Sequence, residues 1–311
     1  MSRLRTAAEH YLAMRRTLGF KLTSQGRLLL EFIDYCEQHQ LDQVHADVAL
    51  RWATNPPKGG QDRVYHARRL MVVRIFARHL VTIDSATEVP PPDLLPSHYR
   101  RVTPHVFTTD EIHALLVAAD GLQPALRAAT WLTLLGLLAV TGMRISEVCN
   151  LNVDDIDEGS GAVRIINSKF NKSRQVLLHS TTLDALASYR RQRQTLRPSA
   201  TTPALLINSC GRRLDSGNAT ATFAELVDAA GVAARPGQRR PRLHDIRHSV
   251  AVWTLMDWYR DGGDVQARLP LLSTWLGHID PKSTYWYLQA VPELLSLAAG
   301  RLEADRGQVA S

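Results

Sequence analysis

Apolar residues recur at helical spacing along most of the chain. In the first third, this spacing predicts helices over about residues 3–18, 24–39, 46–54 and 61–80. Further helices are predicted over about 110–119, 124–140, 144–150, 181–196, 216–230, 243–259, 270–276, 281–287 and 293–303. Among them, three short runs separated by turn residues predict a small three-stranded antiparallel sheet: Val153–Asp157, Ala162–Asn167 and Gln175–His179. The pattern therefore indicates a mainly helical protein with one small sheet.

Residues 84–106 interrupt the helical pattern. They contain three consecutive prolines, Pro90–Pro92, two further prolines and little periodicity, which is typical of a semi-extended linker. We therefore predict a helical domain over residues 1–83, a linker over 84–106 and a larger domain over 107–311. A length of 311 residues fits two domains.

The positive charge is concentrated near the N-terminus. The formal net charge is +7, and residues 1–83 hold thirteen Lys and Arg against seven Asp and Glu, so the remaining chain supplies only about +1. This distribution makes nucleic acid the first partner to consider. The helix over about 61–80 is predicted to turn six apolar residues inward: Val64, Ala67, Leu70, Met71, Ile75 and Leu80. Its opposite face carries five arginines, which are either phosphate contacts or an ordinary solvated face: Arg63, Arg68, Arg69, Arg74 and Arg78.

Cysteine usage and hydropathy indicate a cytoplasmic protein. Cys36, Cys149 and Cys210 form no CxxC pair, and each is interpreted as a small buried apolar residue in a reducing compartment. The first residues lack the apolar core of a signal peptide. The longest uncharged run, Ala128–Met143, has 16 residues and is shorter than the roughly 20 that a membrane span needs. We expect no membrane association.

The first candidate for chemistry is the segment Thr141-Gly-Met-Arg-Ile-Ser-Glu147. Arg144 follows a very apolar helix, where a guanidinium group loses hydration unless it meets an anion. Glu147 lies three residues further on, on the same helical face. A purely structural Arg144–Glu147 ion pair is the alternative to an anion-binding site.

A second candidate is His244-Asp-Ile-Arg247-His248. His244 and Arg247 are separated by three residues and face the same way on the predicted helix. An arginine fork suits bidentate phosphate binding, and a histidine can act as acid or base near neutral pH. His244 and His248, four residues apart, could alternatively bind a metal ion.

Downstream, Leu-Gly-His278 is followed nine residues later by Tyr287, with a second tyrosine, Tyr285, as the less favoured candidate nucleophile. Tyr285 and Trp286 are then expected to be packing aromatics. Upstream, the predicted hairpin tip carries Lys169, which could reach into a groove and protonate a leaving group. Lys172 is the alternative lysine for this task.

The chain thus carries, in sequence order, Arg144, Lys169, His244, Arg247, His278 and Tyr287. With these residues it resembles the tyrosine recombinase (phage integrase) family over about residues 5–303. The resemblance rests on the Thr-Gly-x-Arg-x-Ser-Glu box, a hairpin lysine about 25 residues later, His-x-x-Arg, Leu-Gly-His and the tyrosine nine residues beyond that histidine. It implies a SAM-like helical core-binding domain over 1–83 that binds DNA. It also implies a catalytic domain over 107–311, mostly helical with a small three-stranded antiparallel sheet. The hairpin lysine departs from the family pattern, because Ser168 and Phe170 flank it where glycines are common.

The resemblance also implies residue roles. Tyr287 attacks the scissile phosphate and forms a 3′-phosphotyrosine, Lys169 protonates the leaving 5′-hydroxyl, and His244 manages the tyrosine proton. Arg144, Arg247 and His278 hold the non-bridging oxygens, and Glu147 supports the histidine or the arginine. The DNA-binding residues are expected to be Arg63, Arg68, Arg69, Arg74, Arg78, Lys172 and Arg174.

The implied enzyme is a site-specific DNA recombinase, integrase-like or transposase-like, that needs no metal, cofactor or ATP. It acts on double-stranded DNA as a homotetramer on paired sites, alone or with related recombinases. A DNA-binding regulator without the chemistry and a metal-dependent nuclease built on His244 and His248 remain alternatives. The helix over about 293–303 caps its own domain or docks on a neighbouring protomer, the second being slightly favoured. Residues 259–271 are expected to form a loop of their own.

Overall fold

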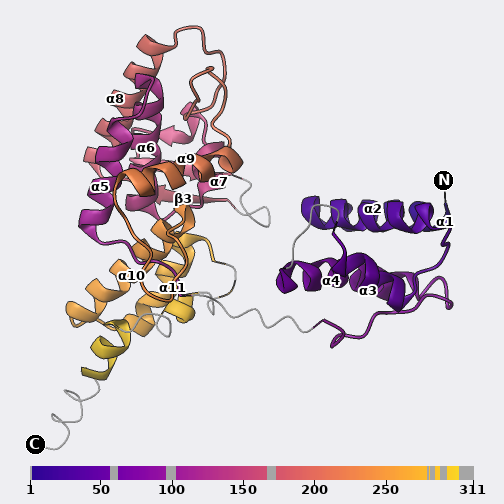
Figure 1. The fold of residues 1–311 in the computed structure, drawn as a ribbon. Coiled ribbons are helices and arrows are strands. Elements are labelled where there is room, and N and C mark those ends of the chain that lie inside the picture. The colour runs from indigo at the N-terminus through magenta and orange to yellow at the C-terminus, as the bar shows by residue number, and fades with distance from the viewer. Residues whose placement is uncertain are drawn as a thin grey trace, which may run out of the picture. The chain divides into compact units, whose positions relative to one another are not determined.

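The structure is a computed structural model of the 311-residue chain, and it describes residues 2–56, 62–95, 103–166, 173–278, 280, 284–287 and 293–300. The chain forms two compact units, Met1–Arg101 and Val102–Ser311. Figure 1 shows the helices of each unit gathered around its own core. Each unit is therefore described by itself.

The first unit is a bundle of four described helices. They are α1 (Arg3–Thr17), α2 (Thr23–Gln38), α3 (Ala46–Thr54) and α4 (Arg63–Leu80). Their bounds lie within two residues of the predicted ones. All four helices contribute to one apolar cluster, which includes the aromatic side chains of Phe32, Trp52 and Phe76. Trp52 meets Phe32 edge to face, with 5.2 Å between ring centroids.

The inward face of α4 agrees only in part with the predicted one, in that Ala67, Leu70 and Leu80 are buried. Val64, Met71 and Ile75 are exposed, whereas Val73 and Phe76 are buried. Because α4 carries apolar residues on nearly every side, its sequence fits more than one buried stripe. The packing against α1, α2 and α3 selects one of them.

Two of the five arginines on α4 are held by the protein. Arg69 is buried, lies over the ring of Trp52 at 3.7 Å from its centroid and donates a hydrogen bond to the Trp52 carbonyl. Placing it on an exposed face was therefore wrong. Arg74 is half-buried and donates to the carbonyls of Pro90 and Pro91 at 2.8 and 2.6 Å. Residues 84–95, assigned to the linker by sequence, thus pack along the first unit as far as these prolines. Arg63, Arg68 and Arg78 are exposed.

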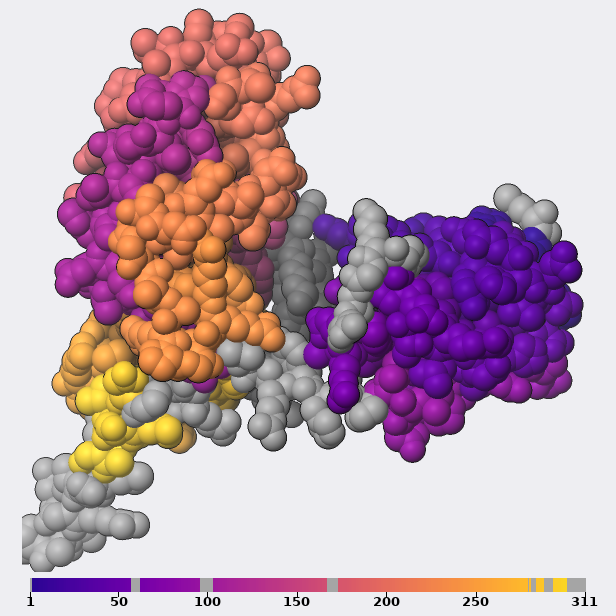
Figure 2. All heavy atoms as spheres, viewed as in Figure 1, coloured from indigo at the N-terminus to yellow at the C-terminus, as the bar shows by residue number. Residues whose placement is uncertain are grey.

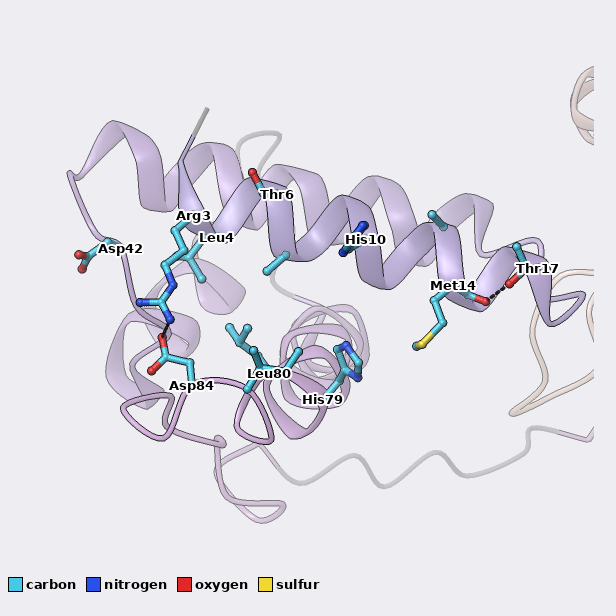
Figure 3. A pocket seen from close by; sticks show the side chains of 13 residues that line it. Arg3, Leu4, Thr6, His10, Met14, Thr17, Asp42, His79, Leu80 and Asp84 are labelled. Atoms are coloured by element: carbon cyan, nitrogen blue, oxygen red, sulfur yellow. Dashed lines mark hydrogen bonds and ion pairs between the residues drawn. The ribbon is translucent and has the colours of Figure 1, made fainter.

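A groove of about 690 Å³ runs between α1 and the end of α4 in the first unit. Figure 3 shows Leu4, Met14 and Leu80 along it, with His10 and His79 nearby and an Arg3–Asp84 ion pair at one end. None of the residues expected to carry out chemistry lines this groove.

The second unit combines helices with a small sheet. Its helices are α5 (Thr109–Asp120), α6 (Ala125–Thr141), α7 (Ile145–Asn150), the 3-10 turn η1 (Val153–Asp155), α8 (Ser180–Leu196), α9 (Ser216–Ala229), α10 (Leu243–Arg260) and α11 (Val265–Leu276). The apolar helix α6 lies at the centre, packed against α5, α8 and α10. The mainly helical fold predicted from the sequence is confirmed.

The sheet is antiparallel, with strand order β1 (Ile156–Asp157), β2 (Ala162–Ile165) and β3 (Arg174–Leu177). Buried Val163 on β2 faces buried Val176 on β3, which fixes the register. β1 is shorter than the predicted strand over 153–157, because Val153–Asp155 forms a 3-10 turn. Lys169 and Lys172 lie outside the described residues, and the described part of the chain resumes just before β3.

The region expected to be a loop, residues 259–271, is mostly helical. α10 continues to Arg260, and α11 already begins at Val265 with Pro270 inside it. Asp264 caps α11 by accepting a hydrogen bond from the Ala267 N–H. Only residues 261–264 separate the two helices, so the prediction of a separate loop was wrong.

Helical segments at 284–287 and 293–300 follow α11. Leu294 is fully buried in an apolar cluster with Leu255 of α10 and Leu272 of α11. In Figure 2, the segment 293–300 (yellow) lies on the surface of the second unit beside the end of α10. Within a single chain, this segment thus packs on its own domain through Leu294, while Leu295 is exposed.

Two features bear on the expected environment of the protein. Among the residues that the structure describes, no helix has both the length and the hydropathy to cross a membrane. Cys36 and Cys149 are buried, but Cys210 is exposed. Cys210 follows Asn208 in a polar turn, whose backbone N–H groups bond the Asn208 side chain, so its interpretation as a buried residue was wrong.

Candidate active site

The end of α6 brings Arg144 into position. Gly142 ends this helix in the left-handed region, with φ of 62°. A Cβ atom there would lie 2.9 Å from Cδ2 of Leu276 at the end of α11, so the two helix ends approach too closely for a side chain. The chain turns at this point and Arg144 becomes the N-cap of α7.

Arg144 and Glu147 form the predicted pair. The Arg144 Nη1 group donates to Oε1 of Glu147 at 2.7 Å, and the Arg144 backbone N–H donates to Oε2 at 3.0 Å. The Nη2 group donates to the Gly277 carbonyl at 2.8 Å. The guanidinium is therefore held from two sides.

A second arginine, Arg174 at the start of β3, binds the same carboxylate. Its Nη1 and Nη2 groups donate to the two oxygens of Glu147 at 3.1 and 2.8 Å, and its Nε donates to the Trp275 carbonyl at 2.9 Å. Burial raises the pKa of Glu147, but hydrogen bonds from Arg174 and from the Arg144 backbone outweigh it and hold this pKa at about 2. Glu147 is thus an ionised carboxylate between two guanidinium groups.

Arg247 on α10 is the third arginine of the site. Only 2% of it is exposed, and it donates to the carbonyls of Leu276 at 2.6 Å and Gly142 at 2.8 Å. Burial and the nearby charge of Arg144 lower its pKa to about 10, so it remains a cation at neutral pH.

The C-terminal end of α11 anchors all three arginines. The consecutive carbonyls of Trp275, Leu276 and Gly277 accept hydrogen bonds from Arg174, Arg247 and Arg144 respectively. The last carbonyls of a helix have no partner within it and carry its negative dipole end. Three guanidinium groups satisfy them here, so that side chains from the start of α7, from β3 and from α10 meet at one helix end.

The backbone conformation and the close neighbours of Gly277 explain the glycine in the Leu-Gly-His motif. Its φ is +68°, and a Cβ atom on it would lie 2.7 Å from Nη1 of Arg174. Conformation and space therefore both exclude a side chain at this position.

His278 follows directly. Its Nδ1 lies 2.7 Å from the Thr284 hydroxyl, which in turn lies 2.7 Å from the Ser273 hydroxyl. Burial, followed by the charges of Arg247 and Arg144, lowers the pKa of His278 to about 3. The ring is therefore neutral at pH 7 in the absence of an anion.

Tyr287 lies against His278, its ring stacked at 6.3 Å between centroids. Only 2% of Tyr287 is exposed, and its hydroxyl lies 2.7 Å from Nδ1 of His248. Tyr285 is 45% exposed and Trp286 is half-buried. The expectation that Tyr285 is a packing aromatic was therefore wrong.

His244 lies one helical turn before His248, with 4.7 Å between ring centroids. Its side chain faces solvent on one side. Desolvation on the other side, followed by the nearby His248 and Arg247, lowers the pKa of His244 to about 4. In the described part of the chain, no group of three or more His, Cys, Asp or Glu residues could hold a metal ion.

The structure thus gathers five of the predicted residues in the second unit: Arg144, Glu147, Arg247, His278 and Tyr287. Two contacts were missed from the sequence. Arg174 was predicted to contact DNA, whereas its side chain binds Glu147. The only available signal for this contact was its spacing from the hairpin lysine. His248 was considered only as a metal ligand, and its place one turn after His244 was the available signal.

Comparison with known proteins shows which family has a sequence that matches this part of the chain. A sequence model described as the phage integrase family matches residues 105–293, which include all five gathered residues. The chain belongs to the phage integrase family. It is a tyrosine-type site-specific recombinase, as the relatives within this family indicate.

Similarity to other phage integrase family members extends over nearly the whole chain. The protein y4rB of Sinorhizobium fredii, whose name describes it as an integrase/recombinase, is 38% identical over 97% of this chain and 98% of its own. The tyrosine recombinase XerC of Mycobacterium bovis is 32% identical over 79% of each chain.

Solved structures share the fold at low sequence identity. The XerH recombinase, solved in a post-cleavage complex with its difH substrate, matches with a TM-score of 0.65 and 17% identity over 91% of this chain and 80% of its own. The Tn1549 transposon integrase, solved with transposon end DNA, matches with a TM-score of 0.65 and 14% identity over 92% and 94%.

Proposed function

We propose that this recombinase cuts and rejoins double-stranded DNA through a covalent 3′-phosphotyrosine intermediate on Tyr287, without metal or ATP. The observation that carries the proposal is the anchoring of Arg144 and Arg247 on adjacent carbonyls, Gly277 and Leu276, immediately before His278 and beside Tyr287. A nucleophile and two fixed cations in one place are what phosphodiester transfer requires.

The two guanidinium groups and His278 would hold the non-bridging phosphate oxygens. Each guanidinium has five N–H donors, and its hydrogen bonds to the described part of the protein orient it through two of them. Charge on the phosphate grows in the transition state, so fixed positive groups stabilise that state more than the bound substrate. This function requires no metal ion.

The leaving 5′-hydroxyl needs a proton, which we assign to Lys169, with Lys172 as the alternative. Both assignments rest on the sequence. Arg174 supports them indirectly, because it ties the strand that follows the hairpin tip to Glu147 and to the end of α11. A covalent phosphotyrosine also conserves the energy of the broken bond, so that a strand can be rejoined without ATP.

Binding of DNA by the first unit would use the exposed arginines of α4: Arg63, Arg68 and Arg78. Arg69 and Arg74 are engaged with the protein. Two solved relatives support DNA as the partner and a tetramer as the assembly: a lambda integrase tetramer bound to a Holliday junction and the XerH–difH complex. We propose that this chain acts as a homotetramer on paired sites, alone or with related recombinases.

A suicide duplex tests the function. This substrate carries the cognate site with a nick that lets the cleaved end diffuse away, and the incubation contains EDTA. The expected result is a covalent protein–DNA adduct that Tyr287→Phe abolishes and Tyr285→Phe retains. No adduct on a verified site would refute the proposal, and cleavage that EDTA abolishes would favour a metal-dependent nuclease.

A further inference from the structure

The hydroxyl of Tyr287 has a specific partner, His248. Its Nδ1 atom lies 2.7 Å from the tyrosine oxygen, which is a hydrogen-bond distance for direct proton transfer. His248 is held in this place by α10, whose neighbouring residue Arg247 is anchored on the Leu276 carbonyl. On the histidine side, the contact therefore involves a helix and not a loop.

His244, to which the sequence assigned the tyrosine proton, contacts the ring of His248. The two imidazole rings meet edge to face at 4.7 Å, and His248 then meets Tyr287 at 5.5 Å between ring centroids. His244 faces solvent, whereas Tyr287 is almost fully buried. His248 thus contacts both the buried nucleophile and the exposed histidine.

A charge on the Tyr287 oxygen would have a cation nearby. Arg247 is close enough for its positive charge and a charge on Tyr287 to stabilise each other. Because Tyr287 is only 2% exposed, bulk water has little access to its hydroxyl. A tyrosine ordinarily ionises near pH 10, so a buried one needs a neighbouring acceptor to become a nucleophile at neutral pH.

We propose that His248 is a catalytic residue that accepts the Tyr287 proton during strand cleavage. In the cleavage step, the O–H bond of Tyr287 breaks and its proton moves to Nδ1 of neutral His248. The tyrosine oxygen forms a bond to phosphorus, the bond from phosphorus to the 5′-oxygen breaks, and the leaving oxygen takes a proton from the general acid, Lys169. In religation, the 5′-hydroxyl gives its proton back to Lys169, its oxygen forms a bond to phosphorus, and the bond from phosphorus to the tyrosine oxygen breaks as that oxygen regains its proton from His248.

This inference rests on the proposed function, because it assigns the proton of the same nucleophile. The test is the single-turnover rate of adduct formation on the suicide duplex, measured for wild type, His248→Asn, His248→Ala and His244→Asn. Asparagine places a polar atom near the position of Nδ1 but cannot take up a proton. His113→Asn, at an exposed histidine on α5, is the matched control.

The expected result is a fall in rate of about 100-fold or more for both His248 variants, in the range of general base catalysis, with unchanged DNA affinity and thermal stability for His248→Asn. His244→Asn should be less affected and His113→Asn unaffected. A duplex with sulfur in place of the leaving 5′-oxygen, which needs no protonation, should restore Lys169→Ala but not His248→Asn.

Three results would overturn the inference. A wild-type rate for His248→Asn would mean that a hydrogen bond alone suffices. If His248→Ala formed the adduct faster than wild type, the contact would only restrain the tyrosine. Rescue of His248→Asn by the sulfur substrate would place His248 on the leaving-group side. Each of these presupposes a Tyr287-dependent adduct in wild type, so failure of the proposed function itself is recognised separately, by the absence of that adduct.

Discussion

Arg174 donates two hydrogen bonds to the Glu147 carboxylate, from Nη2 to Oε2 at 2.8 Å and from Nη1 to Oε1 at 3.1 Å. Glu147 is 6% exposed and also binds Arg144, one of the two arginines expected to hold phosphate. Arg174 therefore acts on the phosphate site through a carboxylate, as a positioning residue that orients Arg144. A carboxylate with two guanidinium partners keeps its charge and its orientation.

Replacing Arg174 should weaken both the fold and the cleavage step. Arg174→Ala leaves Glu147 with one guanidinium partner in a buried place, so we expect the free energy of unfolding to fall by about 2–4 kcal/mol. Arg174→Lys keeps the charge but not the two-point contact and should fold better yet cleave slowly. Urea unfolding and single-turnover cleavage measure the two effects. Arg164→Ala, at an exposed position of β2, is the control, and equal cleavage by Arg174→Lys and wild type would contradict the positioning role.

Gly277→Ala should be more harmful than an alanine at another glycine of the same conformation. Gly231 has φ of +66° and no atom within 4 Å of the position that a Cβ would take, whereas at Gly277 a Cβ would collide with the Arg174 guanidinium. Both variants carry the strain of a left-handed residue, about 1 kcal/mol. Only Gly277→Ala should also lose cleavage activity. If the two variants behaved alike in urea unfolding and cleavage, the collision would have no consequence.

Arg144→Ala and Arg247→Ala should each reduce cleavage far more than binding. Loss of one fixed donor to a developing charge costs about 3–4 kcal/mol of transition-state stabilisation, a factor of hundreds in single-turnover rate. DNA affinity, followed by a mobility-shift titration, should change little, because the many other phosphate contacts remain. A parallel collapse of affinity would show that these arginines serve binding instead.

Arg68 and Arg69 are adjacent in sequence and should respond in opposite ways. Arg68 is exposed, so Arg68→Ala should reduce the slope of log affinity against log salt by about 1 and leave stability unchanged. Arg69 is buried over Trp52, so Arg69→Ala should lower the free energy of unfolding by about 1–3 kcal/mol. A reduced salt slope for a fully folded Arg69→Ala would contradict this division.

The pH dependence of stability should reveal His278. Its pKa of about 3 in the folded chain lies below the ordinary value near 6.5. The stability that this difference contributes is complete above pH 6.5 and is lost as the pH falls towards 3, because the unfolded chain takes up the proton first. His278→Asn should flatten the unfolding free energy between pH 6.5 and 4. Phosphate would raise this pKa, so DNA binding at pH 5–6 should take up protons, which calorimetry in buffers of different ionisation enthalpy detects.

Much of the secondary structure could be predicted because helical periodicity is a local property. The helices over 46–54 and 124–140 agree with α3 and α6 within one residue. Predictions failed where the pattern was ambiguous: α4 is apolar on nearly all sides, and Pro270 lies inside α11. There, contacts with distant segments outweigh local preference.

The sequence by itself determined the family of this protein and most of the residues at its site, because the types Arg, His and Tyr at fixed spacing record the chemistry. Only the tertiary structure decided which groups touch. Trp275, Leu276 and Gly277 accept from arginines 101, 29 and 133 residues away in sequence. Such partners are chosen by the packing of α6, α10, α11 and β3, and no local pattern encodes them. The tyrosine's contact with His248 and the engagement of Arg174 with Glu147 emerge for this same reason.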